Sequence, residues 1–428
     1  MFSRGTRCWR VEIRQTENLF REIFGIAMRR LKKLTPQDLL LAVPALVVAV
    51  LLRAIRPIAT IRFRNMPADE VGPLTVVSQH YLRIRESRPK PRQFDFWYLK
   101  DSIKVSNEYM LAFVESQIKI HRSRFIELVA AWSEKLPWAE RHLIESEIRI
   151  TLLEGVGSKL RLPQKDQDAL RDYLCQIGID PKKEFVALIV RDGAYKSDIV
   201  QPNSQLRTDK ENYRNQDIND YLPVAEKFAS LGVQVIRMGA KVERRFESQS
   251  PLIIDYATTG KRTEAADIYL TSECSMCIST NLGFDHIAAM GGKLRVITNQ
   301  ALIVQASTLF YSSDVFILQR FAETASGKNL TLTESLQFAE IRNLDWYHKV
   351  IDRGLKFVRN TPNEILEASL EGWQRRNSQW VDTAEDLELQ AQFWYIYDRF
   401  FPDHKSRYLN GRPHIGSHFL RTNKWWLA

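Results

Sequence analysis

Short apolar runs alternate with polar segments between Phe185 and Asn299, and their spacing predicts strands separated by helices. The strands are expected at 185–190, 233–238, 252–256, 275–279 and 294–298, and the helices at 218–230, 264–270 and 284–290. Phe185–Val190 is apolar throughout, which is typical of a strand buried on both faces. Asp217 suits the N-cap of the first helix, and Gly232 follows its end. Together these elements predict a doubly wound sheet of the kind that binds nucleotides.

A second alternation begins at Ile58. Strands are expected at 58–63, 74–77 and 94–99, and helices at 107–120 and 125–134. This order indicates another parallel sheet covered by helices on both faces. A polar loop at 65–73 leaves the first strand at the edge where α/β sheets keep their active-site loops. With 428 residues, 44% of them hydrophobic, the chain is long enough for two Rossmann-like domains, which we place at 58–175 and 176–345.

The remaining C-terminal part, 346–428, predicts two long amphipathic helices at 362–376 and 384–400. Thr361 and Pro362 suit the N-cap and N1 positions of the first helix. Aromatic residues on these helices, among them Trp373 and Trp394, would be buried. The helices could cap one domain or pack back across both domains, and the sequence leaves both arrangements open.

The first 57 residues predict a membrane-associating segment. The apolar run Leu39–Leu52 lies between basic clusters, and as a helix it would be only ~21 Å long, short of the ~30 Å hydrocarbon core. Basic residues at both ends favour a helix in the plane of the inner membrane surface, with contact through residues 29–57. A secretory signal fits less well, because the run starts late and no small-residue cleavage site follows. A buried core helix is the other alternative.

The positive charge of the chain is local. The net charge is +10, and residues 1–64 hold about 13 Lys and Arg against 4 Asp and Glu, so the remainder is nearly neutral. This distribution favours an anionic membrane surface, and no nucleic-acid partner is expected. Four cysteines are too few for a disulfide scaffold and fit reduced thiols in the cytosol.

Two motifs could suggest a metal ion, and neither predicts a metal site. Cys274 and Cys277 have the spacing of half a zinc site, but no second pair of ligands accompanies them, so a buried strand is expected. Asp166 and Asp168 form an Asp-x-Asp pair in a Lys- and Asp-rich helical segment, which reads as a solvated face.

Anion-binding residue types stand where three predicted strands end. Arg191, Arg237 and Ser279-Thr280 fall at carboxyl ends, where an α/β sheet binds its ligands. Arginine and hydroxyl groups there suit a diphosphate, and Asn281 and Gly283 suit a tight turn. In the alternative interpretation, Arg191 and Arg237 only pair with Asp192 or Asp217 at the surface.

The chain lacks G-x-G-x-x-G, a P-loop and G-x-S-x-G, which counts against dinucleotide oxidoreductases, P-loop kinases and α/β-hydrolases. Without a metal, arginines, hydroxyls and a helix N-terminus would stabilise a departing nucleoside diphosphate, as in a metal-independent sugar transferase.

Several blocks resemble a family of bacterial glycosyltransferases linked to surface-polysaccharide synthesis. They are Val190–Asp192 with Tyr195, Tyr213–Ile218, Val235–Gly239, Cys277–Gly283, Asn360–Ile365 and Ile415–Leu420. Val71-Gly-Pro-Leu74 stands where the family pattern has Ile-Gly-His-Leu. More distantly, 185–299 is similar to the donor domain of fucosyltransferases. The resemblance implies a GT-B-like architecture, a nucleotide-sugar donor bound by the second domain, and a glycan or lipid-linked acceptor held by the first.

We therefore expect a cytoplasmic, membrane-attached, metal-independent glycosyltransferase without a cofactor, and we expect Arg191 and Asp192 to act in catalysis. The expected donor contacts are Arg191, Arg214, Asn215, Arg237, Gly239, Ser279, Thr280, Asn281, Gly283 and Asp285. A non-catalytic nucleotide-sugar-binding or assembly module is the alternative. An epimerase or hydrolase fits less well, because the chain shows neither a cofactor loop nor a nucleophile. The general base and the stereochemical outcome stay open.

Overall fold

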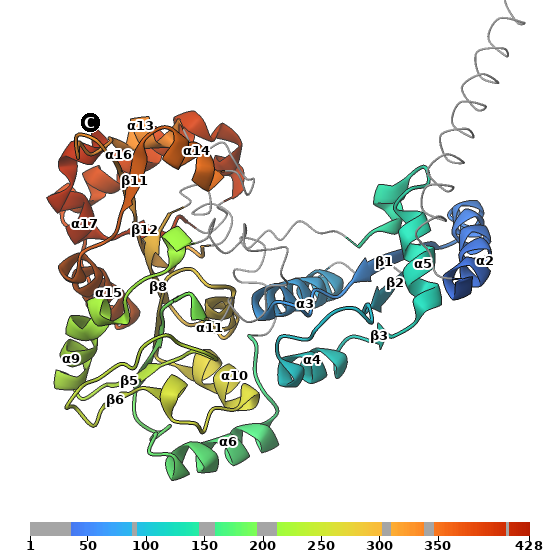
Figure 1. Cartoon of the computed structure of the whole chain (residues 1–428), viewed down its shortest axis with the longest axis horizontal. Helices are drawn as coiled ribbons and strands as arrows, with labels where there is room; N and C mark the ends of the chain where they lie inside the picture. The colour runs from blue at the N-terminus through green and yellow to red at the C-terminus, as the bar shows by residue number, and fades with distance from the viewer. Residues whose placement is uncertain are drawn as a thin grey trace, which may run out of the picture. The chain divides into compact units, whose positions relative to one another are not determined.

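The computed structural model describes residues 36–87, 92–144, 159–194, 212–301, 310–337, 346–407 and 411–428 (Figure 1). The chain forms two compact units. Unit 1 comprises 1–69, 88–106 and 114–147, and unit 2 comprises 70–87, 107–113 and 148–428. Three segments that we placed in the first domain, 70–87, 107–113 and 148–175, thus belong to the unit that contains the C-terminal sheet. Tyr195 and the loop that follows it lie outside the described residues.

Unit 1 contains a small parallel sheet in the order β1-β2-β3. The strands are β1 (Thr60–Asn65), β2 (Gln93–Tyr98) and β3 (Ile120–His121). Helix α2 (Pro36–Ala54) packs on α5 (Arg124–Ser133). Apolar residues of both helices form one core with Phe63 and Tyr98 of the sheet. The predicted strands near 58 and 94 and the helix near 125 are confirmed. Within the described ranges, none of the helices combines the length and the apolar character needed to cross a membrane.

Unit 2 is built on a seven-stranded parallel sheet in the order β12-β9-β8-β7-β4-β5-β6. Its strands are β4 (Phe185–Ile189), β5 (Gln234–Arg237), β6 (Ile253–Ile254), β7 (Met276–Ser279), β8 (Arg295–Gln300), β9 (Val315–Leu318) and β12 (His414–Ile415). All five predicted strands are confirmed, and β9 and β12 were not predicted. From β4 the chain proceeds to β5 and β6 on one side and then resumes at β7 on the other. The topological switch point therefore lies between β4 and β7.

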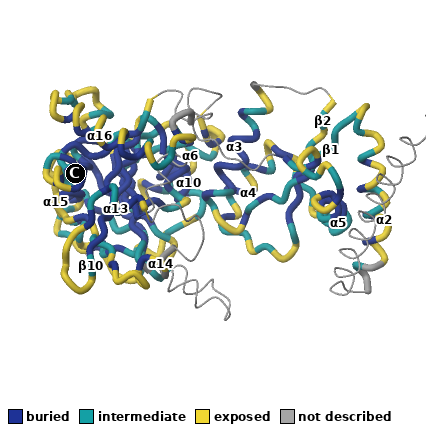
Figure 2. The backbone as a smooth tube through the Cα atoms, turned by 90° about the horizontal axis from the view of Figure 1, so that it is seen from above, coloured by how far each residue is buried: buried dark blue, intermediate teal, exposed yellow. Residues whose placement is uncertain are grey.

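Helices cover both faces of this sheet, as the alternation along the sequence predicts (Figure 1). Val186 and Leu188 of β4 share a core with α9 (Leu222–Ser230) and α15 (Pro362–Arg376). Residues of the opposite face include Ser279, which meets the segment before α11 (His286–Met290). Helices α10 (Glu264–Glu273) and α3 (Val71–Ser87) pack on α11, and α6 (Gln164–Gln176) packs on α10. The central strands are buried throughout, and Cys277 of β7 is fully enclosed, as expected (Figure 2).

One prediction in the N-terminal half was wrong, and one holds only in part. Residues 74–77 lie inside helix α3, although Thr75, Val76 and Val77 favour a strand; the whole run 74–81 is buried, so its burial shows no amphipathic period. The helix expected at 107–120 is shorter, since α4 (Glu108–Glu115) ends before β3.

The C-terminal helices α15 and α16 (Ala384–Phe400) occur at the predicted residues. Trp373 and Trp394 are buried in the core of unit 2, so the helices cap this unit. A separate antiparallel pair, β10 (Arg320–Glu323) and β11 (Leu355–Val358), lies between β9 and α15 in the chain. On α6, Asp166 accepts a hydrogen bond from the Tyr109 hydroxyl and Asp168 pairs with Arg171.

The N-cap of α15 provides a stability test. Thr361 Oγ1 accepts from the Glu364 amide at 3.2 Å, and the Glu364 carboxylate accepts from the Thr361 amide at 2.8 Å. Replacing Thr361 with Ala removes one half of this capping box and should lower the free energy of unfolding by about 1 kcal/mol in urea titrations. Thr361→Ser keeps the acceptor and should retain most of the stability. Equal losses in both variants would contradict the capping role.

Candidate functional site

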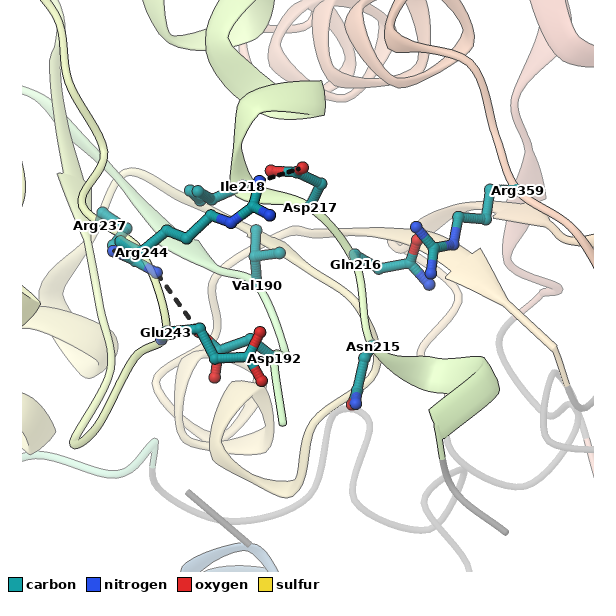
Figure 3. Close-up of a pocket in the computed structure, with 10 residues that line it drawn as sticks. All are labelled: Val190, Asp192, Asn215, Gln216, Asp217, Ile218, Arg237, Glu243, Arg244 and Arg359. Carbon is teal, nitrogen blue, oxygen red and sulfur yellow. Dashed lines mark hydrogen bonds and ion pairs between the residues drawn. The ribbon is translucent and has the colours of Figure 1, made fainter. Parts of the chain in front are cut away.

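A pocket of about 180 Å³ opens at the carboxyl ends of β4 and β5 (Figure 3). It is lined by Val190, Asp192, Asn215, Gln216, Asp217, Ile218, Arg237, Glu243, Arg244 and Arg359. These residues come from the segment after β4, the segment before α9, the β5–β6 loop and the end of β11. Of the residues predicted as site contacts, Asp192, Asn215 and Arg237 line it. The pocket therefore lies at the predicted edge of the sheet, beside the switch point on the β5 side.

Arg237 forms part of the pocket wall. Its side chain is 1% exposed, its Nη1 donates to the Arg244 carbonyl at 2.7 Å, and its guanidinium lies 3.3 Å from Asp255 and 3.6 Å from Asp192. Two carboxylates thus compensate the charge of one buried guanidinium. The predicted strand-end position is correct. Arg237 pairs with Asp192, as in the alternative interpretation, but it does so in the interior and with Asp255 as a second partner, not at the surface.

Asp192 connects two loops at the base of the pocket. Its carboxylate accepts from the amides of Glu243 at 2.9 Å and Ala194 at 3.1 Å, in addition to its pairing with Arg237. In return, the Glu243 carboxylate accepts from the Gly193 amide at 3.0 Å. These reciprocal bonds fix the loop after β4 to the β5–β6 loop. They leave Asp192 engaged in holding the pocket together.

A second group of predicted residues meets at the switch point itself. The Arg191 amide donates to Thr280 Oγ1 at 3.0 Å, and Arg191 Nε donates to Asn215 Oδ1 at 3.1 Å. Arg214 Nη2 donates to the Asn281 carbonyl at 2.7 Å. The segments after β4 and β7 and the segment before α9 are therefore tied together here. Asn215 belongs both to this cluster and to the pocket.

The turn after β7 has the tight geometry that the sequence predicts. Asn281 adopts a left-handed conformation with φ 56°, and its Nδ2 donates to Gln300 Oε1 at 2.7 Å. Next to it, a Cβ on Gly72 would lie 2.4 Å from the Cα of Gly283. The start of α3 and this turn are thus in backbone contact, which requires glycine at position 72; a Cβ on Gly283 would lie 3.2 Å from the Cα of Gly72 and would be tight. Gly239 has a packing role as well, since a Cβ there would lie 2.7 Å from Val242.

Ser279 and Asp285, both predicted as donor contacts, lie in a buried network. Ser279 Oγ donates to Asp285 Oδ2 at 2.6 Å, and Arg295 Nη1 donates to Asp285 Oδ1 at 2.9 Å. Arg295 also pairs with Asp314, and the side chains of Asp285 and Arg295 are 0% exposed. Burial, reinforced by Arg295, lowers the pKa of His286 to about 4, so this imidazole is neutral at pH 7. Through these bonds Ser279 and Asp285 stabilise the turn after β7 from the interior of unit 2, and neither residue lines the pocket.

The sequence did not indicate three of the pocket residues, namely Glu243, Arg244 and Arg359. Arg244 Nη1 donates to Asp217 Oδ2 at 3.1 Å and its side chain is 67% exposed. Arg359 is exposed and lies beside Gln216 (Figure 3). Among the described residues, no carboxylate forms an ion pair with Arg359, although its charge opposes the rise that burial causes in the pKa of Asp220. Two adjacent arginines in a polar loop, Arg244 and Arg245, could have indicated that Arg244 is a pocket residue. Arg359 follows a strand that was not predicted, so nothing in the sequence indicated its position.

In chemical terms the pocket combines cations with engaged carboxylates. Asp192 pairs with Arg237, Asp217 with Arg244, and Glu243 accepts from Gly193. The remaining arginine, Arg359, and the exposed end of Arg244 are the groups best placed to bind an anion. The amides of Asn215 and Gln216 can add neutral hydrogen bonds.

Two of the solved structures to which the chain is similar are glycosyltransferases. The chain is similar to a glycosyl transferase of family 9 from Veillonella parvula, with 11% identity, a TM-score of 0.36, and coverage of 61% of this chain and 86% of that one. It is also similar to the ADP-heptose LPS heptosyltransferase II of E. coli, with 10% identity, a TM-score of 0.32, and coverage of 68% and 98%. Both proteins are glycosyltransferases. Likeness at this level assigns neither a substrate nor a residue role. No family model and no curated protein matches the chain.

The network behind the turn generates a prediction. Asp285→Asn removes one of the two charges that compensate buried Arg295 and should lower the free energy of unfolding by about 3–5 kcal/mol. Asp168→Asn breaks an exposed pair and should stay within about 0.5 kcal/mol of the wild type. Urea titrations of both variants check this. If Asp285→Asn hardly changes the free energy of unfolding, the structural role is contradicted and the predicted role of Asp285 in ligand binding is favoured.

Proposed function

We propose that the protein is a glycosyltransferase that moves a sugar from a nucleotide-sugar donor to a glycan or lipid-linked acceptor. The observation behind this proposal is the pocket at the carboxyl edge of a doubly wound parallel sheet, next to its switch point, with Arg244 and Arg359 at its surface. Ligands of such sheets bind at this edge. The anion-binding groups there suit the diphosphate that every nucleoside-diphosphate sugar carries.

The proposed donor position follows from the charges. Arg359 and Arg244 bind the phosphates, and Asn215 and Gln216 donate or accept hydrogen bonds beside them. Asp217 and Glu243 retain carboxylate lone pairs that can accept from sugar or ribose hydroxyls. From this position the donor extends toward Arg191 and the Thr280–Gly283 turn at the switch point, where the glycosidic bond breaks.

Chemistry at this position needs stabilisation of a leaving nucleoside diphosphate. Arg191 lies at the switch point with Arg214 and can stabilise the negative charge that develops on the leaving phosphate. Asp192, expected in catalysis, acts in this proposal as a positioning residue, because it already accepts from two amides and pairs with Arg237. Guanidinium groups supply the compensating charge, so the proposed transfer is metal-independent and uses no cofactor.

A binding module without catalysis is the second candidate, and one observation favours it. Each of the three carboxylates that line the described pocket already accepts at least one hydrogen bond from the protein. A general base for the acceptor would therefore have to be one of these engaged groups or come from another part of the chain. The cytoplasmic location and the role in bacterial surface-polysaccharide synthesis belong to the proposal through the family resemblance.

The two exposed arginines generate the functional prediction. UDP-, GDP-, CMP- and dTDP-sugars are screened by thermal shift with and without EDTA, and saturating donor at 100 times Kd should add about 2.7 kcal/mol of stability. Arg359→Ala and Arg244→Ala should each weaken the binding of the active nucleotide about 10- to 100-fold in calorimetry, since each removes charge-assisted hydrogen bonds. Arg171→Ala, on the exposed face of α6, is the matched control and should bind like the wild type.

Three results would contradict parts of the proposal. If none of the nucleotide sugars stabilises the protein, the pocket is not a donor site. If one of them binds but is neither transferred nor slowly hydrolysed, the binding module replaces the enzyme. Unchanged affinity in both pocket variants would move the donor away from Arg244 and Arg359.

A further inference from the structure

Helix α2 of unit 1 has two apolar faces of different character. Small residues are buried on one face, where the helix packs on α5: Ala42, Ala45 and Ala49 are at most 1% exposed. Large aliphatic residues recur on the other side and continue into the following turn. The exposed fractions are 78% for Leu40, 60% for Val43, 53% for Val47, 51% for Val50, 55% for Leu51, 39% for Ile55 and 74% for Ile58. We name these seven residues the outer face of α2 (Figure 2).

This arrangement is the reverse of an ordinary surface helix. A helix that lies on a soluble domain buries its large apolar residues and turns polar ones outward. In α2 the three alanines and Leu52 face the domain and Leu46 and Val48 pack partly against it, whereas the residues of the outer face point away from it, and no charged residue occurs between Leu40 and Leu52. Exposed apolar patches of this kind mark contact with a partner or a membrane.

The groups at the C-terminal end of α2 indicate which environment covers this face. Arg53 donates to the Ser133 carbonyl at 2.7 Å, which fixes the C-terminal end of α5 beside the helix. Arg56 lies over the ring of Trp138 at 5.2 Å, and Trp138 is 55% exposed. Tryptophan and arginine next to an apolar face are typical of the interfacial region of a membrane.

Charge supports a lipid surface over a second copy of the chain. The neighbouring segment 133–141 contributes Lys135 and Arg141 against Glu134 and Glu140, so with Arg53 and Arg56 this end of α2 is net basic. Anionic headgroups complement such a rim. A twofold dimer through the outer face would bring like charges together.

We infer that the outer face of α2 binds the surface of an anionic membrane, with the helix axis in the plane of the bilayer. One face of the helix stays packed on α5, so lipid meets the opposite face only. The aliphatic side chains enter the boundary between headgroups and acyl chains, and the basic end with Trp138 lies at headgroup level. This inference goes beyond the proposed activity and holds whether or not the pocket binds a nucleotide sugar.

The test uses the full chain and sedimentation with vesicles of phosphatidylcholine, either pure or mixed with phosphatidylglycerol. The double variant Val43→Glu/Val47→Glu places charges on the outer face, and its partition into mixed vesicles should fall about tenfold or more. Both side chains are exposed, so the fold should persist, which circular dichroism and the melting temperature verify. Leu231→Glu/Val381→Glu changes two exposed aliphatic residues of unit 2, 50% and 82% exposed, and should sediment like the wild type.

Three outcomes would overturn the inference. The wild type could fail to sediment with the mixed vesicles, or it could sediment with pure phosphatidylcholine vesicles equally well. The Val43/Val47 variant could also sediment as fully as the wild type. The remaining possibility is that the outer face binds a second copy of the chain, and light scattering on all variants tests it. The outer face would be a dimer interface if the wild type is a dimer that does not bind vesicles and the Val43/Val47 variant is a monomer.

Discussion

The ion network around Arg295 fixes the part of unit 2 on which the candidate site depends. A fully buried guanidinium is tolerated there because Asp285 and Asp314 both pair with it. Asp285 also accepts from Ser279 and from the Leu282 amide at 2.9 Å, so the same carboxylate that compensates Arg295 shapes the turn after β7. That turn contacts Gly72 of α3 and presents Thr280 and Asn281 to Arg191 and Arg214. The geometry at the switch point thus depends on charges enclosed behind it.

The pocket beside the switch point follows a similar principle. Arg237 is enclosed and compensated, and it fixes Asp192 and the β5–β6 loop, while the exposed arginines remain accessible to solvent. A site that binds a diphosphate without a metal needs both buried and exposed arginines, because the buried charges make the site rigid and the exposed charges bind the ligand. Arg359 belongs to the second class, since no carboxylate of the described residues pairs with it.

Much of unit 2 could be predicted because its signals are local. The apolar runs at 185–190 and 275–279, the N-cap of α15 and the turn at Asn281 depend on neighbouring residues in sequence. The burial of a side chain does not depend on local signals alone. Arg237 and Asp285 were predicted at the correct edge of the sheet, but their burial depends on Asp255, which follows β6, and on Arg295 of β8. Arg359 could not be expected, because β11 brings it to the pocket from more than a hundred residues away. In α3, the β-branched run Thr75–Val77 predicted a strand, but this run is enclosed as part of a helix whose neighbours, such as α11, are distant in sequence.

The most direct measurement of the central claim is a crystal structure of the protein with a bound nucleoside diphosphate. The account predicts phosphate oxygens within hydrogen-bonding distance, about 2.7–3.2 Å, of the guanidinium groups of Arg359 and Arg244, with the distal phosphate directed toward Arg191. A nucleotide bound elsewhere, with these arginines still in solvent or paired with Asp217, would contradict it.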